Sequence, residues 1–170
     1  TYLSLKDNDR PTLKLTLSPS VISENAGNAA TTAWISRSGG NNANPLKVRL
    51  RTSRSEVFAG STVVEIPAGE SGVEVALGVT DNTTVDGSRT CNVIAEAFIE
   101  ADNQYAPSSD KAYSTASRTI VDDESPYLAL TSRSASIAEG GSVTVTVKRY
   151  VATASGDLVV NLSSAASDIT

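Results

Sequence analysis

Apolar and polar residues alternate with a period of two along most of this chain. The alternation begins with Leu13, Leu15 and Leu17 and resumes after a kink at Pro19. It recurs at residues 31–35, 46–50, 64–66, 73–79 and 91–95, and in a last segment that ends at residue 121. A period of two puts every second side chain on one face of a β-strand. The pattern therefore predicts seven short strands between residues 11 and 124.

Turn residues separate the expected strands. Gly, Pro, Asn or Asp occur at residues 38–42, 67–69, 86–87 and 106–108, and these residue types favour tight turns. The chain shows no helical period, and each alternating segment has one apolar face. Strands of that kind form antiparallel sheets that pack apolar face against apolar face. We therefore predict an all-β fold, an antiparallel two-sheet sandwich.

One stretch of the chain occurs twice. Asp122-Asp123-Glu124-Ser125-Pro126 resembles Asp7-Asn8-Asp9-Arg10-Pro11, and the residues after each copy match at a spacing of about 115 residues. We expect three segments: the C-terminal end of a preceding repeat at 1–10, a complete repeat at 11–124, and an incomplete N-terminal part of the next repeat at 125–170. We also expect the sequence to be a piece of a longer tandem array, and residues 126–170 to need the rest of their repeat to fold.

The two copies come back into alignment after a three-residue slip. Ile35-Ser36-Arg37 then matches Val147-Lys148-Arg149. Further along, Leu46, Val48 and Leu50 match Leu158, Val160 and Leu162. The second copy is therefore expected to contain strands at residues 128–131, 143–147 and 158–162.

Composition narrows the classes of partner. The chain is 39% hydrophobic and 19% charged, with a net charge of −5. Nucleic acids and anionic membranes bind clustered cations, so a net acidic chain argues against both as main partners. No apolar run reaches the 18 or so residues of a membrane span, and we expect none in this segment.

Signatures of catalysis are missing. The sequence has no His and one Cys, Cys91, which shares a strand face with Val93 and Ala95 and is expected to be a small buried hydrophobe. A phosphate-binding Gly loop and a nucleophile elbow are also absent. We therefore expect a protein that is not an enzyme.

Four short motifs, taken in order, resemble the Calx-beta repeat family. They are Ile22-Ser23-Glu24, Ile66-Pro67-Ala68-Gly69-Glu70-Ser71, Asp81-Asn82 with Val85-Asp86-Gly87, and Val121-Asp122-Asp123-Glu124. The resemblance covers essentially the whole chain. It implies an immunoglobulin-like sandwich of the kind found in Na/Ca exchangers and in tandem arrays of bacterial and animal surface proteins.

The same resemblance implies a Ca²⁺ site at one end of the sandwich. By position its ligands are Glu24, Asp81, Asp86, Asp122, Asp123 and, less directly, Glu124. Carboxylate oxygens that converge from several loops suit Ca²⁺. Two features depart from the family pattern: residues 52–55 carry no acid, and Arg89 stands where a second Glu is common. Because an arginine can pair with acids in place of a metal, both a Ca²⁺ site and a salt-bridged junction are open.

Trp34, Lys47, Arg49 and Arg51 form a candidate contact surface. Trp34 faces away from the expected core, and it either contacts a partner or packs beneath a loop such as 98–110. The three cations form an outward stripe on one strand. They suit an acidic partner or a polysaccharide, or they are solvent-facing cations that protect an edge strand.

Two main functions are consistent with these features. The first is a structural or adhesive module of a long extracellular or cell-surface protein, such as an adhesin, a matrix component or a filament, with Ca²⁺ stiffening the repeat junctions. Its partners would be neighbouring repeats, other copies in a fibre, or surface proteins and glycans. The second is a regulatory Ca²⁺-sensing domain of a membrane transporter. A carbohydrate-binding module that uses Trp34 and the basic stripe is a third possibility.

Overall fold

A computed structural model describes residues 10–55, 63–152 and 156–164 of the chain. The chain divides into two compact units, Thr1–Ser125 and Pro126–Thr170. Residues 1–9, expected to end a preceding repeat, lie outside the described residues, as do residues 165–170 of the expected last segment. No helix in the described part is long and apolar enough to cross a bilayer.

The described part of the first unit contains nine strands and one short 3₁₀ helix. These elements are β1 (Thr12–Ser18), β2 (Val21–Ser23), η1 (Glu24–Ala29), β3 (Thr31–Ser38), β4 (Leu46–Thr52), β5 (Val63–Ile66), β6 (Gly72–Leu77), β7 (Arg89–Ile99), β8 (Gln104–Tyr105) and β9 (Tyr113–Val121). The predicted seven strands are found when β1 and β2 are taken as two halves of one kinked strand and the two-residue β8 is set aside.

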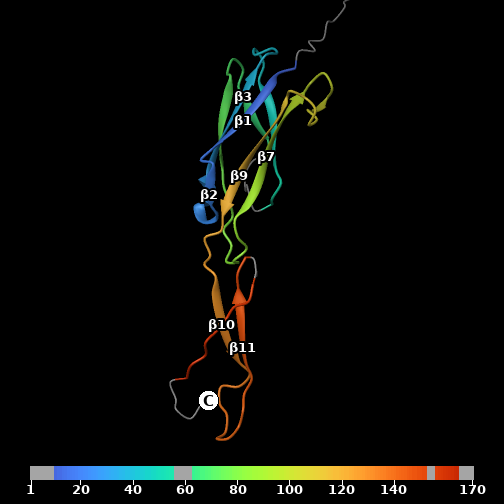
Figure 1. The fold of residues 1–170 in the computed structure, drawn as a ribbon. Helices are drawn as coiled ribbons and strands as arrows, with labels where there is room; N and C mark the ends of the chain where they lie inside the picture. Colours follow the sequence, from blue (N-terminus) through green and yellow to red (C-terminus); the bar gives the residue numbers. More distant parts are fainter. Residues whose placement is uncertain (1–9, 56–62, 153–155, 165–170) are drawn as a thin grey trace, which may run out of the picture. The chain divides into compact units, whose positions relative to one another are not determined.

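The strands form two sheets that face each other (Figure 1). The smaller sheet has the order β1–β3–β6, and the larger has the order β2–β9–β7–β4–β5, with β8 paired to the end of β7. The chain therefore changes sheets between β1 and β2, at the kink predicted around Pro19. β2 runs parallel to β9, while the other described pairs of this unit are antiparallel. The predicted all-β, immunoglobulin-like sandwich is confirmed.

The core lies between the two sheets. Leu13, Leu15 and Leu17 of β1 are buried and alternate with exposed residues, as the period of two predicts. Cys91 and Val93 of β7 are each 1% exposed, so Cys91 is the buried hydrophobe that was expected. A smaller cluster fills the end of the sandwich where β2 joins β9 and consists of Ile22, Ala30, Val79, Cys91 and Ile120.

The helix η1 is not predicted by the hydrophobic pattern. Gly27 within it has a φ of 70°, which glycine adopts without strain, and its carbonyl accepts a hydrogen bond from the amide of Val79 at 2.9 Å. The backbone of Asn28 lies so close to Gly78 that a Cβ there would come within 2.8 Å. These contacts tie η1 to the segment after β6 and hold Glu24, its first residue.

The second unit contains β10 (Tyr127–Ser132) and β11 (Val145–Tyr150), which pair antiparallel. Leu128 lies opposite Arg149, just as Leu13 lies opposite Arg37 in the first unit. The two hairpins therefore have the register that the internal alignment, with its slip, implies.

The third strand expected in the second copy is not formed. Residues 156–164 contain no strand, so the prediction for 158–162 was wrong within the described residues. In the first unit the aligned strand, β4, is hydrogen-bonded between β5 and β7. The described part of the second unit supplies no such neighbours, and a strand needs partners for its backbone groups. Leu158 and Leu162 are accordingly 50% and 65% exposed.

Candidate metal centre

Strand pairing collects acidic residues at the β2–β9 end of the first unit. The parallel pair ends with Ser23 opposite Val121, so the next residues, Glu24 and Asp122, follow adjacent strand ends. Arg89 begins β7 and lies opposite Ile120 of β9. Residues that are distant in sequence thus converge because β9 lies between β2 and β7.

Glu24 is the most buried member of this group, with 0% of its surface exposed. Its Oε1 accepts hydrogen bonds from Asn82, one from the backbone amide at 3.1 Å and one from Nδ2. Its Oε2 lies 3.0 Å from Nη2 of Arg89 in an ion pair. A buried carboxylate is stable only when it is paired and hydrogen-bonded. Asn82 supplies the hydrogen bonds to Oε1, whereas Oε2 has the ion pair with Arg89 but no hydrogen bond among the described residues.

Arg89 places a positive charge inside the acidic group. Its side chain is 9% exposed, and it pairs with Asp86 as well as Glu24. Arg54, in the segment where the sequence resemblance implies an acid, donates from Nε to the carbonyl of Thr90 at 2.9 Å. Arg54 and Arg89, at the two positions where the sequence departs from the pattern implied by the resemblance, thus both lie at this end of the sandwich.

The acidic run after β9 is held by local hydrogen bonds. Asp122 accepts one from the amide of Gly87 and another from the amide of Glu124 at 3.2 Å, while Asp123 accepts one from Nδ2 of Asn25 at 2.7 Å. The Gly87 bond is the main cause that holds the pKa of Asp122 below its ordinary value.

The carboxyl of Glu124 behaves differently from that of Asp122. A hydrogen bond to Asp122, partial desolvation and the nearby negative charges raise the pKa of Glu124 to about 7. Of the two groups, Glu124 is therefore the one that binds a proton more readily. One oxygen of Glu124, Oε2, is buried without a hydrogen-bond partner among the described residues.

The carboxylates form two overlapping groups, each with oxygens within 4.8 Å of one another: Glu24, Asp123 and Glu124, and Glu24, Asp86 and Asp122. Both offer the hard oxygen ligands that Ca²⁺ prefers. The first contains the orphaned Oε2 of Glu124, and a cation would satisfy that costly buried acceptor. The second is already bridged by Arg89. Arg89 thus pairs with two members of the second group, Glu24 and Asp86, and with one member of the first, Glu24. Asp123 and Glu124 carry no arginine among the described residues, so the first group is the better fit to a hard cation.

The structure does not bring together the whole ligand set that the sequence predicted. Asp81 is exposed and belongs to neither carboxylate group found in the described residues. Its neighbour Asn82 faces Glu24 instead. Sequence reasoning missed Asn82 and Asn25, because a neutral amide carries no signal for a metal site even where it orients the acids.

The candidate contact surface is divided between the two sheets. Trp34 is on β3 and 40% exposed, and a Cβ added at Gly72 of β6 would lie 2.7 Å from its Cζ2. Its ring thus packs on Gly72 rather than beneath loop 98–110, which belongs to the other sheet. Lys47, on β4 of that other sheet, is exposed and lies opposite Glu65 of β5.

The two arginines of the predicted basic stripe are bound to a buried acid. Arg49 and Arg51 both pair with Glu96, whose side chain is 5% exposed. The guanidinium of Arg49 also lies 4.1 Å from the ring centroid of Tyr105. The edge-strand explanation was wrong, because β4 lies between β5 and β7. Sequence reasoning missed Glu96, since a charged residue on an outward position is normally exposed.

No protein-family model and no curated protein matches the sequence. Among solved structures, an apo-form Calx CBD1 domain is 16% identical, with a TM-score of 0.43 over 66% of this chain and 99% of that one. The calcium binding domain CBD12 of CALX1.1 is 18% identical, with a TM-score of 0.42 over 65% of this chain and 45% of that one. A CsuC–CsuE chaperone–tip adhesion subunit complex from Acinetobacter baumannii is 14% identical, with a TM-score of 0.37 over 80% and 71%. Likenesses this distant assign no function, and the fold class rests on the chain's own strand pairing.

Proposed function

We propose that this chain is a non-catalytic structural or adhesive module of a long extracellular or cell-surface protein. Its first unit would hold Ca²⁺ through Glu24, Asp123 and Glu124. The observation that carries this proposal is the meeting of these three carboxylates within 4.8 Å of one another. Asp123 and Glu124 lie just before Ser125, the last residue of the first unit. A cation that joins them to Glu24 would pin the segment that leads to the next unit.

Each residue of the group has a definable part in this proposal. Glu24 supplies a carboxylate that is held rigid by Asn82 and Arg89. Asn25 orients Asp123. Glu124 supplies the oxygen that lacks a partner in the described protein, and it would release its proton when a cation binds. Bound Ca²⁺ would supply two positive charges where carboxylates now repel one another.

The metal part of the proposal is tested by thermal unfolding of the 170-residue chain in Ca²⁺ and in chelator. At a free concentration a hundredfold above the dissociation constant, a ligand that binds only the folded state stabilises it by about 2.7 kcal/mol. For a unit of this size that raises the melting temperature by about 10 °C. Mg²⁺ should do much less, because it demands a tighter octahedral site.

Two variants complete this experiment. Asp123→Ala should abolish the response to Ca²⁺, while Asp157→Ala, at an exposed acid of the second unit, should keep it. Equal melting curves in Ca²⁺ and chelator would rule out the metal and leave a salt-bridged end of the unit. The proposed location is tested separately: protease treatment of intact source cells should release fragments of this chain if it lies outside the membrane.

A further inference from the structure

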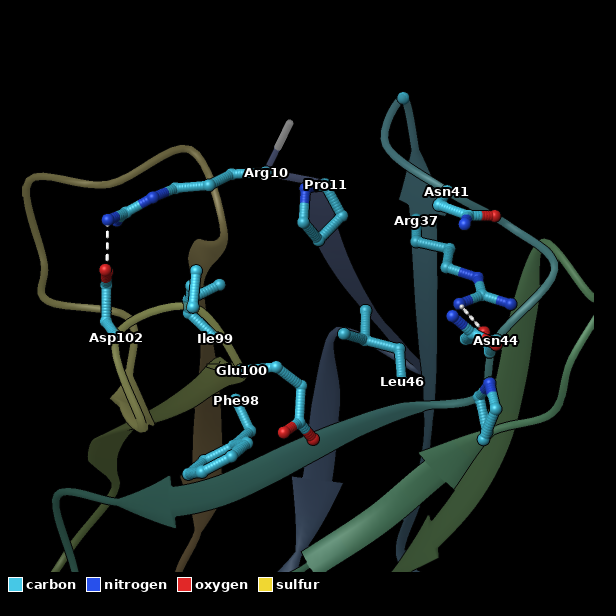
Figure 2. Close-up of a pocket in the computed structure, with 13 residues that line it drawn as sticks. Arg10, Pro11, Arg37, Asn41, Asn44, Leu46, Phe98, Ile99, Glu100 and Asp102 are labelled. Carbon is cyan, nitrogen blue, oxygen red and sulfur yellow. Dashed lines mark hydrogen bonds and ion pairs between the residues drawn. The ribbon is translucent and has the colours of Figure 1, made fainter. Parts of the chain in front are cut away.

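A pocket of about 210 Å³ opens at the other end of the first unit, away from Glu24. Figure 2 shows residues that line it. It lies where β1 begins, β3 gives way to β4, and β7 ends. Sites for drug-sized ligands usually measure about 300–1,000 Å³. The pocket here is smaller than that range, so it suits a ligand of about one small ring.

One part of the pocket wall is apolar. Pro11, Leu46, Phe98 and Ile99 line it. Phe98 is fixed by an edge-on contact with Tyr105, whose ring centroid lies 5.2 Å away. Ring C–H groups of a ligand can pack against such a surface.

The opposite wall contains a rigid buried arginine. Arg37 is 8% exposed, and backbone carbonyls hold its guanidinium. Nε donates to Glu70 at 3.0 Å, Nη1 to Asn44 at 2.8 Å, and Nη2 to Asn42 at 3.2 Å and Pro67 at 2.8 Å. A guanidinium has five N–H groups, so one on Nη1 is left without a partner among the described residues.

Two further polar residues, Glu100 and Asn44, line the pocket, and both are exposed to solvent. The carboxylate of Glu100 makes no hydrogen bond or ion pair with the described residues, and Figure 2 shows it directed into the space between Phe98 and Leu46. The side-chain amide of Asn44 is likewise unpaired within the described part of the chain. The charged side chains at the rim, in contrast, are paired with one another, because Arg10 forms ion pairs with Asp102 and Asp110.

We propose that this pocket binds one neutral sugar ring. A sugar hydroxyl both donates and accepts hydrogen bonds, and the pocket offers an acceptor in Glu100 and donors in Asn44 and Arg37. The apolar wall suits the C–H face of the ring. An anion would be repelled by Glu100. A purely apolar ligand would leave the polar wall unsatisfied, which is costly.

This site is separate from the proposed metal centre and from the contact surface that the sequence predicted. It uses neither Trp34 nor the arginines of β4, which lie on the outer faces of two different sheets. It also uses no residue of the two carboxylate groups. Sugar binding in chelator therefore tests it independently of Ca²⁺.

The experiment titrates the isotope-labelled 170-residue chain with methyl α-mannopyranoside, methyl β-glucopyranoside, methyl β-galactopyranoside and N-acetylglucosamine, followed by amide NMR shifts. A ligand with roughly a dozen non-hydrogen atoms should bind with a dissociation constant on the order of 1 mM. At least one sugar should shift the amides of residues 41–46 and 98–102. An absence of saturable shifts with all four sugars overturns the proposal.

Variants of Glu100 separate a sugar from a cationic ligand. Glu100→Ala should weaken sugar binding about tenfold, while Glu100→Gln, which keeps an acceptor oxygen, should retain it within about threefold. Glu139→Ala, an exposed acid of the second unit, is the matched control and should bind normally. Equal losses in Glu100→Gln and Glu100→Ala overturn the proposal, and so do shifts of the same amides by lysine methyl ester but by no sugar.

Discussion

Nη2 of Arg89 lies 3.0 Å from Oε2 of Glu24, and both side chains are almost wholly buried. Arg89 begins β7, whereas Glu24 follows β2, and these strands are separated by β9 in the larger sheet. The pair therefore spans three strands at the acidic end of the first unit. It places a fixed cation where the resemblance implied an acid, and Glu24, which the arginine holds, belongs to both carboxylate groups.

Removing Arg89 should destabilise the protein and increase its response to Ca²⁺. Arg89→Ala leaves Glu24 buried without its cation, which costs about 3–5 kcal/mol in the free energy of unfolding. Added Ca²⁺ should recover part of that loss, so the rise in melting temperature should exceed that of the unmodified chain. Arg133→Ala, at an exposed arginine, is the control. A variant that is destabilised but no more responsive to Ca²⁺ would show that Arg89 does not compete with metal.

Asn82 should be needed for the stability of the buried acid. Asn82→Ala removes the Nδ2 bond to Glu24 and the bond that Oδ1 accepts from the amide of Thr84 at 2.6 Å, and it keeps the backbone bond to Glu24 at 3.1 Å. A hydrogen bond to a charged group contributes about 1.5–3 kcal/mol, so the free energy of unfolding in urea should fall by that amount. Asn28→Ala, at an exposed asparagine of η1, should have little effect. Equal losses in the two variants would contradict the assigned role.

Glu96 should confer part of the acid sensitivity of the protein. Burial opposes its ionisation, but hydrogen bonds from Arg51 and Arg49 outweigh burial and hold the pKa of Glu96 below its ordinary value of 4.5. Its contribution to stability is therefore present above pH 4.5 and is lost as pH falls through the lower, folded-state pKa. Glu96→Gln should lower stability at pH 7 by about 1–3 kcal/mol and flatten the decline in acid.

A matched control for Glu96 is Glu65→Gln, at an exposed glutamate on β5. Urea unfolding between pH 3 and pH 7 measures both variants. A Glu96→Gln protein that loses stability in acid as steeply as the unmodified chain would contradict the prediction.

Replacing Gly72 with a larger residue should lower the free energy of unfolding. A Cβ at this position would lie 2.7 Å from the carbonyl oxygen of Ile35 and 2.7 Å from Cζ2 of Trp34. Gly72→Ala should therefore cost about 1–3 kcal/mol. Adding Trp34→Ala should relieve only part of that cost, because the contact with the Ile35 backbone persists. A double-mutant cycle by thermal unfolding checks this, and full recovery in the double variant would contradict it.

Arg37 should be irreplaceable by lysine. Lysine lacks the planar fork with which Arg37 reaches four carbonyls, so Arg37→Lys should destabilise the first unit by about 2–4 kcal/mol. Arg149, which holds the same register position in β11, is the matched control. Arg149→Lys should leave the unfolding transition of the first unit unchanged. A first unit that unfolds normally with Arg37→Lys would show that the carbonyl contacts contribute little.

Much of the fold could be predicted from the sequence. The period of two identified the strands and the buried face of β1, because alternation is a property of one strand and needs no knowledge of its neighbours. The internal alignment implied that Leu13 and Leu128 would occupy equivalent register positions, and they do. The resemblance also implied Glu24, Asp86, Asp122, Asp123 and Glu124, which the structure brings together in two overlapping groups.

The contacts between strands could not be read from the sequence. The parallel pairing of β2 with β9 joins residues such as Ile22 and Ile120, and it determines which acids meet Arg89. The burial of Glu96 beneath two arginines also depends on β4 lying beside β7. Periodicity specifies which face of a strand is apolar, whereas the identity of the neighbouring strand depends on the packing of the whole sandwich. Only the tertiary structure therefore showed that Asn82, rather than Asp81, contacts Glu24. It likewise showed that Arg89 forms ion pairs with Glu24 and Asp86.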